Sequence, residues 1–271
     1  GQALLQALLK ALWLARVRDS YLAQVFVDEA TDFSAVQLAC MAELAHPRVR
    51  SWFAAGDFRQ RITAHGIRDA SQLEWLANTI GLPQELERRA MVTAYRQSLP
   101  LRCLAEAMDG RPAGAALSAQ VSDVADVADP LPLLKENLAS DDVADWISER
   151  LEEIEDRSGT TPSIAILVDG DAQVDALAAR LKPAVRRHSL SVVGCPGGVS
   201  IGEGAFVRVF DVRHIKGLEF EAVFFIGVDA LERSMPDLFD RFLYVGVTRA
   251  ATFLGVTCAG ALPTRLDSVR Q

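Results

Sequence analysis

Closely spaced cysteines and long apolar runs are both missing from this sequence of 271 residues. The four cysteines are scattered without any C-x-x-C spacing: Cys40, Cys103, Cys195 and Cys258. Such scattering argues against a thiolate metal site and indicates free thiols in a reducing compartment, so we expect a cytoplasmic protein. No apolar run is long enough to cross a bilayer, so we expect no membrane partner. Segment 1–19 has helical spacing and lacks the charged start of a signal peptide, which predicts an amphipathic helix.

Lysine is also scarce, because arginine supplies most of the 28 basic residues. The loop that grips nucleotide phosphates has the form G-x-x-x-x-G-K-[ST], in which the lysine follows a glycine. Every lysine of this chain follows leucine or isoleucine instead: Lys10, Lys135, Lys182 and Lys216. The sequence therefore contains no such loop. Its net charge of -8 disfavours a surface that binds nucleic acid everywhere, but it allows a local basic groove.

Several short apolar runs end in glycine or an acid: 25–29, 51–57, 163–170, 221–229 and 252–260. Stretches with helical spacing separate some of them, and this alternation predicts an α/β fold with parallel strands covered on both faces. Ligands of such sheets bind at the carboxyl ends of the strands. We expect the following residues there: Asp28, Glu29, Gly56, Asp57, Gly170 and Asp229.

A change of composition suggests where the chain divides. Residues 110–132 are rich in alanine, serine, aspartate and proline and lack helical periodicity, which is typical of a linker. We therefore expect a first domain at 1–100, a linker at 101–132 and a second domain at 133–271.

Two adjacent acids follow the first apolar run, in VFVDEATDF (25–33). A strand that brings Asp28 and Glu29 to a sheet edge suits a Mg²⁺ site, with the first acid on the metal and the second activating water. The same two residues also suit a helix N-cap followed by a first-turn acid. The residues alone leave both interpretations open.

Two further motifs in this half allow either a nucleotide role or a plain structural one. In GDFRQ, Gln60 could lie near a phosphate, or Asp57 could simply cap a turn. In AYRQS, Tyr95 could stack on a base while Arg96 contacts a phosphate. The same motif also fits a tyrosine at an interface beside a solvated arginine.

The C-terminal half contains HIKGLEF between two strand-like segments, and VTRA before another strand. The glycine of the first motif permits close backbone approach, although a turn with surface charges has the same pattern. In the second motif Arg249 could stabilise phosphoryl transfer as an arginine finger. It could equally pack its aliphatic stem on a helix face.

Taken in order, five stretches resemble motifs II to VI of superfamily 1 DNA helicases of the UvrD/Rep-like branch: DEATDFS, GDFRQRI, AYRQS, KGLEFEAV and LYVGVTRA. The usual forms in that branch are DEAQD, GDxxQ, YRS, KGLEF and YVAxTRA. The resemblance implies RecA-like domains of the P-loop NTPase type, one partial and one complete. It also implies ATP and Mg²⁺ in the cleft between such domains, with single-stranded DNA crossing the top.

The resemblance further implies a role for each matching residue. Around the nucleotide, Asp28 would bind Mg²⁺, Glu29 would activate the attacking water and Gln60 would sense the γ-phosphate. The other assignments are Asp57 for coupling to movement, Tyr95 for stacking on adenine, Arg96 and Arg249 for the γ-phosphate, and Gly217 with Glu219 for the link to DNA. We expect DNA contacts from Arg213, His214 and Lys216.

The chain departs from the usual motifs at several positions. Thr31 replaces a glutamine, while Asp211 and Arg213 replace a threonine and a histidine of motif V. Thr63 and His65 stand where DNA-facing aromatic residues are common. These changes affect the grip on DNA more than the nucleotide site.

The absent phosphate loop shapes the functional expectation. We expect the C-terminal fragment of an ATP-dependent DNA helicase, with the loop lying upstream of residue 1 and no activity in the chain alone. Its partners would be ATP, single-stranded DNA, and the missing N-terminal segment or another chain that supplies the loop. The alternative is a non-enzymatic, helicase-like module that binds nucleic acid or serves as a scaffold.

Overall fold

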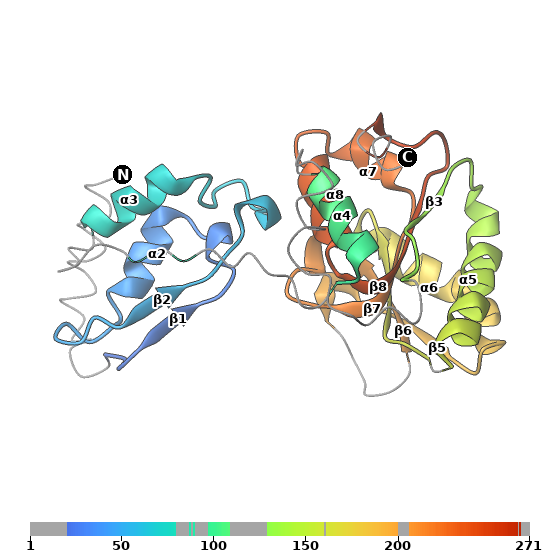
Figure 1. Cartoon of the computed structure of the whole chain (residues 1–271), viewed down its shortest axis with the longest axis horizontal. Helices are drawn as coiled ribbons and strands as arrows, with labels where there is room; N and C mark the ends of the chain where they lie inside the picture. Colours follow the sequence, from blue (N-terminus) through green and yellow to red (C-terminus); the bar gives the residue numbers. More distant parts are fainter. Residues whose placement is uncertain are drawn as a thin grey trace. The chain divides into compact units, whose positions relative to one another are not determined.

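The computed structural model describes residues 21–79, 87, 89, 97–108, 129–159, 161–199, 206–264 and 266. The chain forms two compact units that divide between residues 92 and 93 (Figure 1). The helix expected at 1–19 lies outside the described residues. Within the described part, no helix is both long and apolar enough to cross a membrane.

The N-terminal unit contains a two-stranded parallel sheet with helices packed beside it. Its elements are β1 (Val25–Val27), η2 (Ala30–Asp32), α2 (Ala35–Ala42), β2 (Trp52–Ala54), η3 (Phe58–Gln60) and α3 (Ala70–Thr79). The start of α2 is set by a capping box, in which the Ser34 hydroxyl accepts from the Gln37 amide and the Gln37 side chain accepts from the Ser34 amide. Val25 and Val27 point into a small core with Leu38 and Leu76.

The C-terminal unit is built on six parallel strands in the order β3-β8-β7-β4-β6-β5. The strands are β3 (Leu133–Lys135), β4 (Ile164–Val168), β5 (Ser191–Gly194), β6 (Phe206–Asp211), β7 (Phe220–Phe225) and β8 (Ala250–Thr257). The helices are α4 (Leu99–Met108), η4 (Ser140–Asp142), α5 (Val143–Ser158), α6 (Asp171–Arg186), η5 (Pro196–Gly198), η6 (Val212–His214), α7 (Val228–Ser234) and α8 (Phe239–Val247). The α/β class with parallel strands flanked by helices, which the apolar runs predicted, is confirmed.

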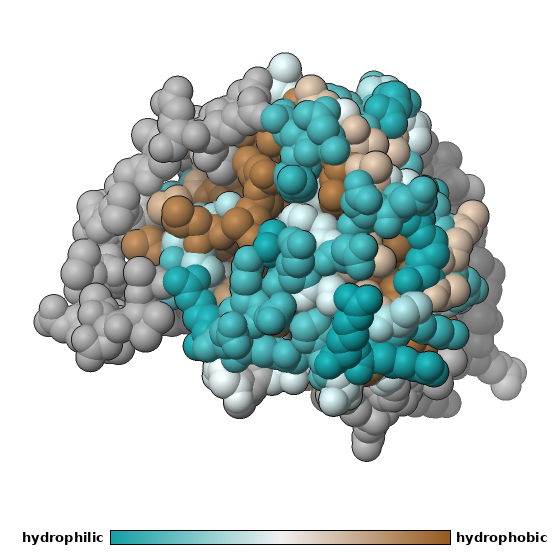
Figure 2. Space-filling model, turned by 90° about the vertical axis from the view of Figure 1, so that its right-hand side faces the viewer, coloured by the Kyte–Doolittle hydropathy of each residue, from teal (hydrophilic) through white to brown (hydrophobic). Residues whose placement is uncertain are grey.

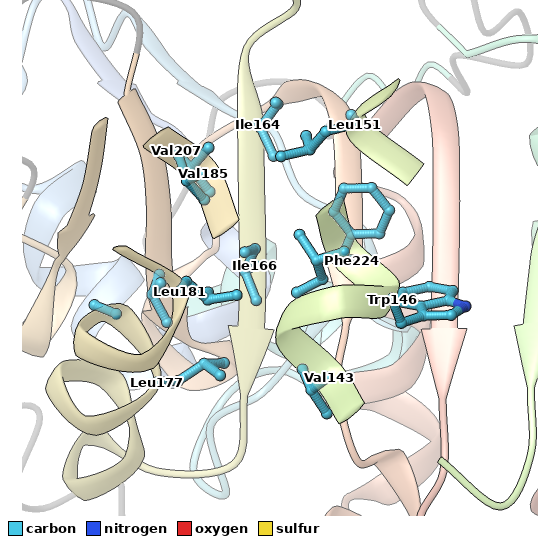
Figure 3. Packing of buried hydrophobic residues seen from close by; sticks show 14 of the residues in the cluster. Val143, Trp146, Leu151, Ile164, Ile166, Leu177, Leu181, Val185, Val207 and Phe224 are labelled. Carbon is cyan, nitrogen blue, oxygen red and sulfur yellow. The ribbon is translucent and has the colours of Figure 1, made fainter. Parts of the chain in front are cut away.

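One face of this sheet is covered by α5 and α6, whose apolar residues recur at helical spacing. Figure 3 shows Trp146 and Leu151 of α5, and Leu177 and Leu181 of α6, packed toward Ile166 and its neighbours on the sheet. All five residues of β4 are buried, as a central strand of a parallel sheet requires. Hydrophilic side chains dominate the side of the molecule drawn in Figure 2, and the charged residues on the outward side of α5 alternate with its buried ones.

The other face is covered by α8 and α4. The side chains of Leu101 and Leu104 are buried where α4 packs on α8 and β8. Residues 97–108 therefore belong to the C-terminal unit, so the units divide earlier than residue 100. The first part of the linker expected at 101–132 is a packed helix, and residues 109–128 lie outside the described residues.

All four cysteines are free thiols. Two of them, Cys195 and Cys258, are buried in the C-terminal unit. Burial, with a smaller contribution from the charge of Asp229, raises the pKa of Cys258 to about 12. This thiol therefore stays protonated at neutral pH and is a poor nucleophile.

Candidate functional site

The acid pair lies directly after β1. The Asp28 carboxylate accepts a hydrogen bond of 2.8 Å from the Glu29 amide, and Asp28 is exposed. Glu29 has a φ of 51° and a ψ of 37°, in the left-handed region that non-glycine residues seldom adopt. It precedes the short helix η2, but its side chain makes no capping hydrogen bond. The cap interpretation placed the N-cap at Asp28 and a first-turn acid at Glu29, whereas the structure has Glu29 itself at the cap position of η2.

The Gly-Asp motif after β2 joins the acid pair at the same edge of the sheet. The Ala30 amide donates to the Ala55 carbonyl at 2.7 Å, and the Thr31 hydroxyl donates to the Asp57 carbonyl at 2.9 Å. A Cβ at Gly56 would lie 2.9 Å from the Thr31 amide nitrogen, so the close approach needs glycine. These contacts make the two loops one structural unit at the carboxyl ends of β1 and β2.

Thr31 contributes to this unit in a way that the sequence did not reveal. It is buried, and its hydroxyl is the side chain that ties the first loop to the second. The sequence showed only that a threonine stands where a glutamine is usual. A second link comes from Asp32, whose carboxylate accepts from the Ile62 amide at 3.1 Å and whose carbonyl accepts from the Thr63 hydroxyl at 2.8 Å.

Asp57 is held by its own loop. Its carboxylate accepts from the Arg59 amide at 2.9 Å and from the Arg59 guanidinium at 2.8 Å. Partial burial acts to raise the pKa of Asp57, but hydrogen bonds and charge from Arg59, with a hydrogen bond from Gln60, leave it below its ordinary value. Asp57 therefore caps η3, as the plain structural interpretation expected, and also lies in contact with Gln60.

Three of the motifs converge at the amino ends of β7 and β8 in the C-terminal unit. The Phe220 amide, at the end of KGLEF, donates to the Arg249 carbonyl at 3.0 Å. The Gln97 side chain donates to the Ala250 carbonyl at 3.1 Å, and the Ser98 amide donates to the Ala251 carbonyl at 2.7 Å. Tyr95 and Arg96, which precede this segment, lie outside the described residues.

Arg249 is buried, with 6% of its surface exposed. Its Nε donates to the Val245 carbonyl at 3.2 Å, and its Nη1 lies 3.4 Å from the Leu218 carbonyl oxygen. Its Nη2 lies 3.4 Å from the Thr248 hydroxyl. The guanidinium thus spans from the end of α8 to the KGLEF turn.

The KGLEF turn also contains Gly217 and Glu219. Gly217 has a φ of 80°, but a Cβ there would meet no atom within 4 Å. The left-handed backbone conformation by itself accounts for a glycine at this position. Glu219 is exposed immediately before β7.

Arg213 and His214 lie at the opposite edge, where β6 ends. The Arg213 guanidinium lies 3.0 Å from the Asp169 carboxylate and 3.1 Å from that of Asp211, while 42% of its side chain remains exposed. The ring of His214 lies 3.5 Å from the Asp171 carboxylate. Lys216, half-buried, follows in the segment that leads back to the amino end of β7. The candidate residues of this unit are therefore divided between the amino ends and the carboxyl ends of the strands of one sheet.

Comparison with known proteins gives two findings. The sequence model of the UvrD-like helicase C-terminal domain matches residues 206–257. The C-terminal domain of a possible DNA helicase from Lactobacillus plantarum WCFS1 is a similar solved structure, with 19% sequence identity and a TM-score of 0.45. The comparison covers 65% of this chain and 94% of that one. No curated protein matches the sequence.

The matched segment runs from the start of β6 to the end of β8 and so includes both KGLEF and VTRA. The resemblance drawn from these two motifs is therefore confirmed for this part of the chain. Its parallel sheet, with helices on both faces, is consistent with a RecA-like helicase domain. Residues 206–257 of this chain are thus similar to the UvrD-like helicase C-terminal domain.

Proposed function

We propose that this chain is the C-terminal portion of an ATP-dependent DNA helicase that moves along single-stranded DNA. The observation that carries the proposal is the convergence at the amino ends of β7 and β8. There the Phe220 amide of KGLEF bonds the Arg249 carbonyl of VTRA, and Gln97 bonds the next residue, Ala250. Two of these motifs lie in the segment that matches the helicase family.

In this function the N-terminal unit supplies groups for Mg²⁺ and water. We assign metal binding to Asp28, water activation to Glu29 and phosphate sensing to Gln60. The hydrogen bonds between the two loops support this assignment, because they hold the acid pair and the Asp57 loop at one edge. A residue in a strained backbone conformation, such as Glu29, is more frequent at functional sites than elsewhere.

The C-terminal unit supplies Arg96 and Arg249 for the γ-phosphate and Tyr95 for stacking on adenine. Two of the described contacts of the Arg249 guanidinium are 3.4 Å long, at Leu218 and Thr248. A phosphate carries a full negative charge, so it binds a guanidinium more strongly than a neutral carbonyl or hydroxyl does. Exchange of the Leu218 carbonyl for a phosphate would free the KGLEF turn, which gives a physical route from nucleotide to the DNA-contacting segment.

The experiment is to measure DNA binding and ATP hydrolysis by the chain itself. We expect labelled single-stranded DNA to bind with an affinity that falls as salt rises. Lys216→Glu should weaken binding several-fold and reduce the salt slope by about one. Lys182→Glu, an equal charge change at an exposed position of α6, is the matched control. No saturable binding at low salt, or equal weakening by both variants, contradicts the proposal.

ATP hydrolysis tests the second part. We expect no turnover above background, with or without DNA, because the sequence contains no G-x-x-x-x-G-K-[ST]. Turnover that disappears in Glu29→Gln would show that the chain hydrolyses ATP without that loop.

The absent loop also favours a second candidate, a non-enzymatic helicase-like module that binds nucleic acid or a protein partner. The gene sequence upstream of codon 1 distinguishes the two. Codons for a phosphate loop there support the helicase, and a start codon immediately before residue 1 supports the module.

A further inference from the structure

Three potential metal ligands meet at the carboxyl edge of the C-terminal sheet, away from Arg249. Asp171 lies in the first turn of α6, Asp211 is the last residue of β6, and His214 ends η6. One carboxylate oxygen from each aspartate and one ring nitrogen of His214 all lie within 4.8 Å of one another. They come together because β4, which leads into α6, pairs with β6 so that Val168 is opposite Asp211.

Both carboxylates are oriented by hydrogen bonds that their Oδ1 atoms accept. Oδ1 of Asp211 accepts from the backbone amide and from Nε of Arg213, at 3.0 and 3.1 Å. Oδ1 of Asp171 accepts from the Gly197 amide at 3.0 Å. The second oxygen of each carboxylate, Oδ2, therefore remains as a potential metal ligand. Oδ2 of Asp171 is also the atom that lies 3.5 Å from Nε2 of His214. Such bonds to the outer side of a ligand are typical of metal sites.

The three side chains differ in burial in a way that suits a bound cation. Asp211 has only 3% of its side chain exposed, so it provides a fixed anchor. Asp171 and His214 are exposed by 45% and 39%, so water can complete the coordination. Gly198, with a φ of 76°, packs against His214, and a Cβ there would lie 2.9 Å from the Cβ of the histidine. A side chain at Gly198 would therefore collide with His214, so glycine is needed for this close packing.

The local charge also favours a cation. Arg213 is the positive neighbour of Asp169 and Asp211, but among the described contacts only His214 lies near Asp171 as a possible cation. A neutral imidazole offers a lone pair instead of a charge. Two carboxylates with one imidazole then leave a net negative site of mixed oxygen and nitrogen donors.

We propose that Asp171, Asp211 and His214 bind one divalent transition-metal ion. A donor set of carboxylate oxygen and imidazole nitrogen suits Mn²⁺ or Zn²⁺, whereas Mg²⁺ and Ca²⁺ favour oxygen alone. The ion would fasten the start of α6 to the turn that precedes KGLEF. It is separate from the Mg²⁺ that Asp28 would hold in the N-terminal unit, and it does not depend on ATP hydrolysis.

The test is calorimetric titration of the whole chain, first freed of metal by a chelator, with MnCl₂ and ZnCl₂. We expect one ion per chain, and at least about a tenfold loss of affinity in Asp171→Asn and in His214→Gln, since even loss of a group that only supports a ligand costs that much. The matched controls are Asp145→Asn and His65→Gln, which change exposed residues elsewhere and should bind as the wild type does. The Mn²⁺ titration is the decisive one, because Mn²⁺ has little affinity for thiolates and so does not bind the cysteines.

A thermal melt separates metal binding from folding. Asp171 and His214 are exposed, so both variants should melt as the wild type does without metal. With Mn²⁺ the wild-type midpoint should rise, because a ligand that binds only the folded state stabilises it. The variants should show little rise. Absence of saturable Mn²⁺ and Zn²⁺ binding by the wild type, or an equal rise in the variants, overturns the proposal.

Discussion

The backbone amide of Phe220 donates to the backbone carbonyl of Arg249 at 3.0 Å, and this bond joins two motifs that lie far apart in the sequence. It continues into the ladder between β7 and β8, where Phe220 pairs with Ala250. The side chain of Arg249 reinforces the junction by reaching the carbonyl of Leu218. The two motifs therefore form one structural feature, and a substitution in one motif should perturb the structure of the other.

Arg249→Ala should destabilise the C-terminal unit by about 2 kcal/mol. The change removes the Arg249 bonds to the Val245 carbonyl, which still accepts from the Thr248 hydroxyl, and to the partly buried Leu218 carbonyl, and the loss of bonds from a charged donor costs free energy. Urea denaturation measures the effect. Arg241→Ala, which removes an arginine from the preceding helix α8, should stay within about 0.5 kcal/mol of the wild type. Equal stability of Arg249→Ala and the wild type would contradict a packing role.

Glu29→Gly should be more stable than Glu29→Ala by about 1 kcal/mol. Both variants remove the carboxylate, but only glycine adopts the left-handed conformation at φ 51° without steric cost. The comparison isolates the backbone, and urea denaturation of the two variants side by side measures it. If alanine is as stable as glycine, the loop relaxes and stores no strain.

Asp57 should make the N-terminal unit sensitive to acid. Because its pKa in the folded chain lies below its ordinary value, the charged form stabilises the fold above that ordinary value. This contribution should disappear as the pH falls below about 4 and through the folded pKa. Denaturation between pH 6 and pH 2.5 should show a smaller loss in Asp57→Asn than in the wild type. Parallel curves would mean that Arg59 and Gln60 do not favour the charged form.

Gly246→Ala should destabilise the fold by about 1 to 3 kcal/mol. This is expected even though the usual helicase motif, YVAxTRA, has alanine at this position. A Cβ on Gly246 would lie 2.7 Å from two ring carbons of Phe225, which allows no ordinary contact. Alanine also favours a helix by about 1 kcal/mol over glycine, so the measured cost is a net value. The double variant with Phe225→Leu should recover stability if the ring is the obstacle.

His188 bridges α5 to the turn after α6, with Nε2 at 3.1 Å from the Ser148 hydroxyl and Nδ1 at 3.0 Å from the Glu155 carboxylate. His188→Ala should cost about 1 to 2 kcal/mol through the loss of these two bonds. His46→Ala, which changes a partly buried histidine of the N-terminal unit, tests whether the effect is local. Thermal melting of the C-terminal unit should respond only to the first variant.

The short apolar runs made much of the fold predictable. β4 is an unbroken buried strand, and α6 repeats apolar residues at helical spacing, so each is recognisable without its neighbours. β3 and α4 were not predicted. β3 has three residues and depends on β8 for its pairing, while α4 depends on burial against α8. Elements whose stability comes from a partner give a weak signal in the sequence.

The candidate site was predictable only in part. Asp28 and Asp57 lie at the carboxyl ends of β1 and β2, as the rule for parallel sheets predicted. Glu219 and Arg249 lie at the amino ends of their strands instead, and Arg213 with His214 at the carboxyl edge. The rule does not predict at which end of a strand a given motif lies, because a motif can precede a strand as readily as follow it.

By itself the sequence determined the parallel α/β class, the absence of a phosphate loop within these 271 residues and the likeness of KGLEF and VTRA to helicase motifs, because these follow from local pattern and residue type. Only the tertiary structure decided that Arg249 is buried against the KGLEF turn, and that Asp171 meets Asp211 and His214. The physical reason is strand pairing. The order and register of the six strands bring distant residues within a few ångströms, and no local pattern encodes that order.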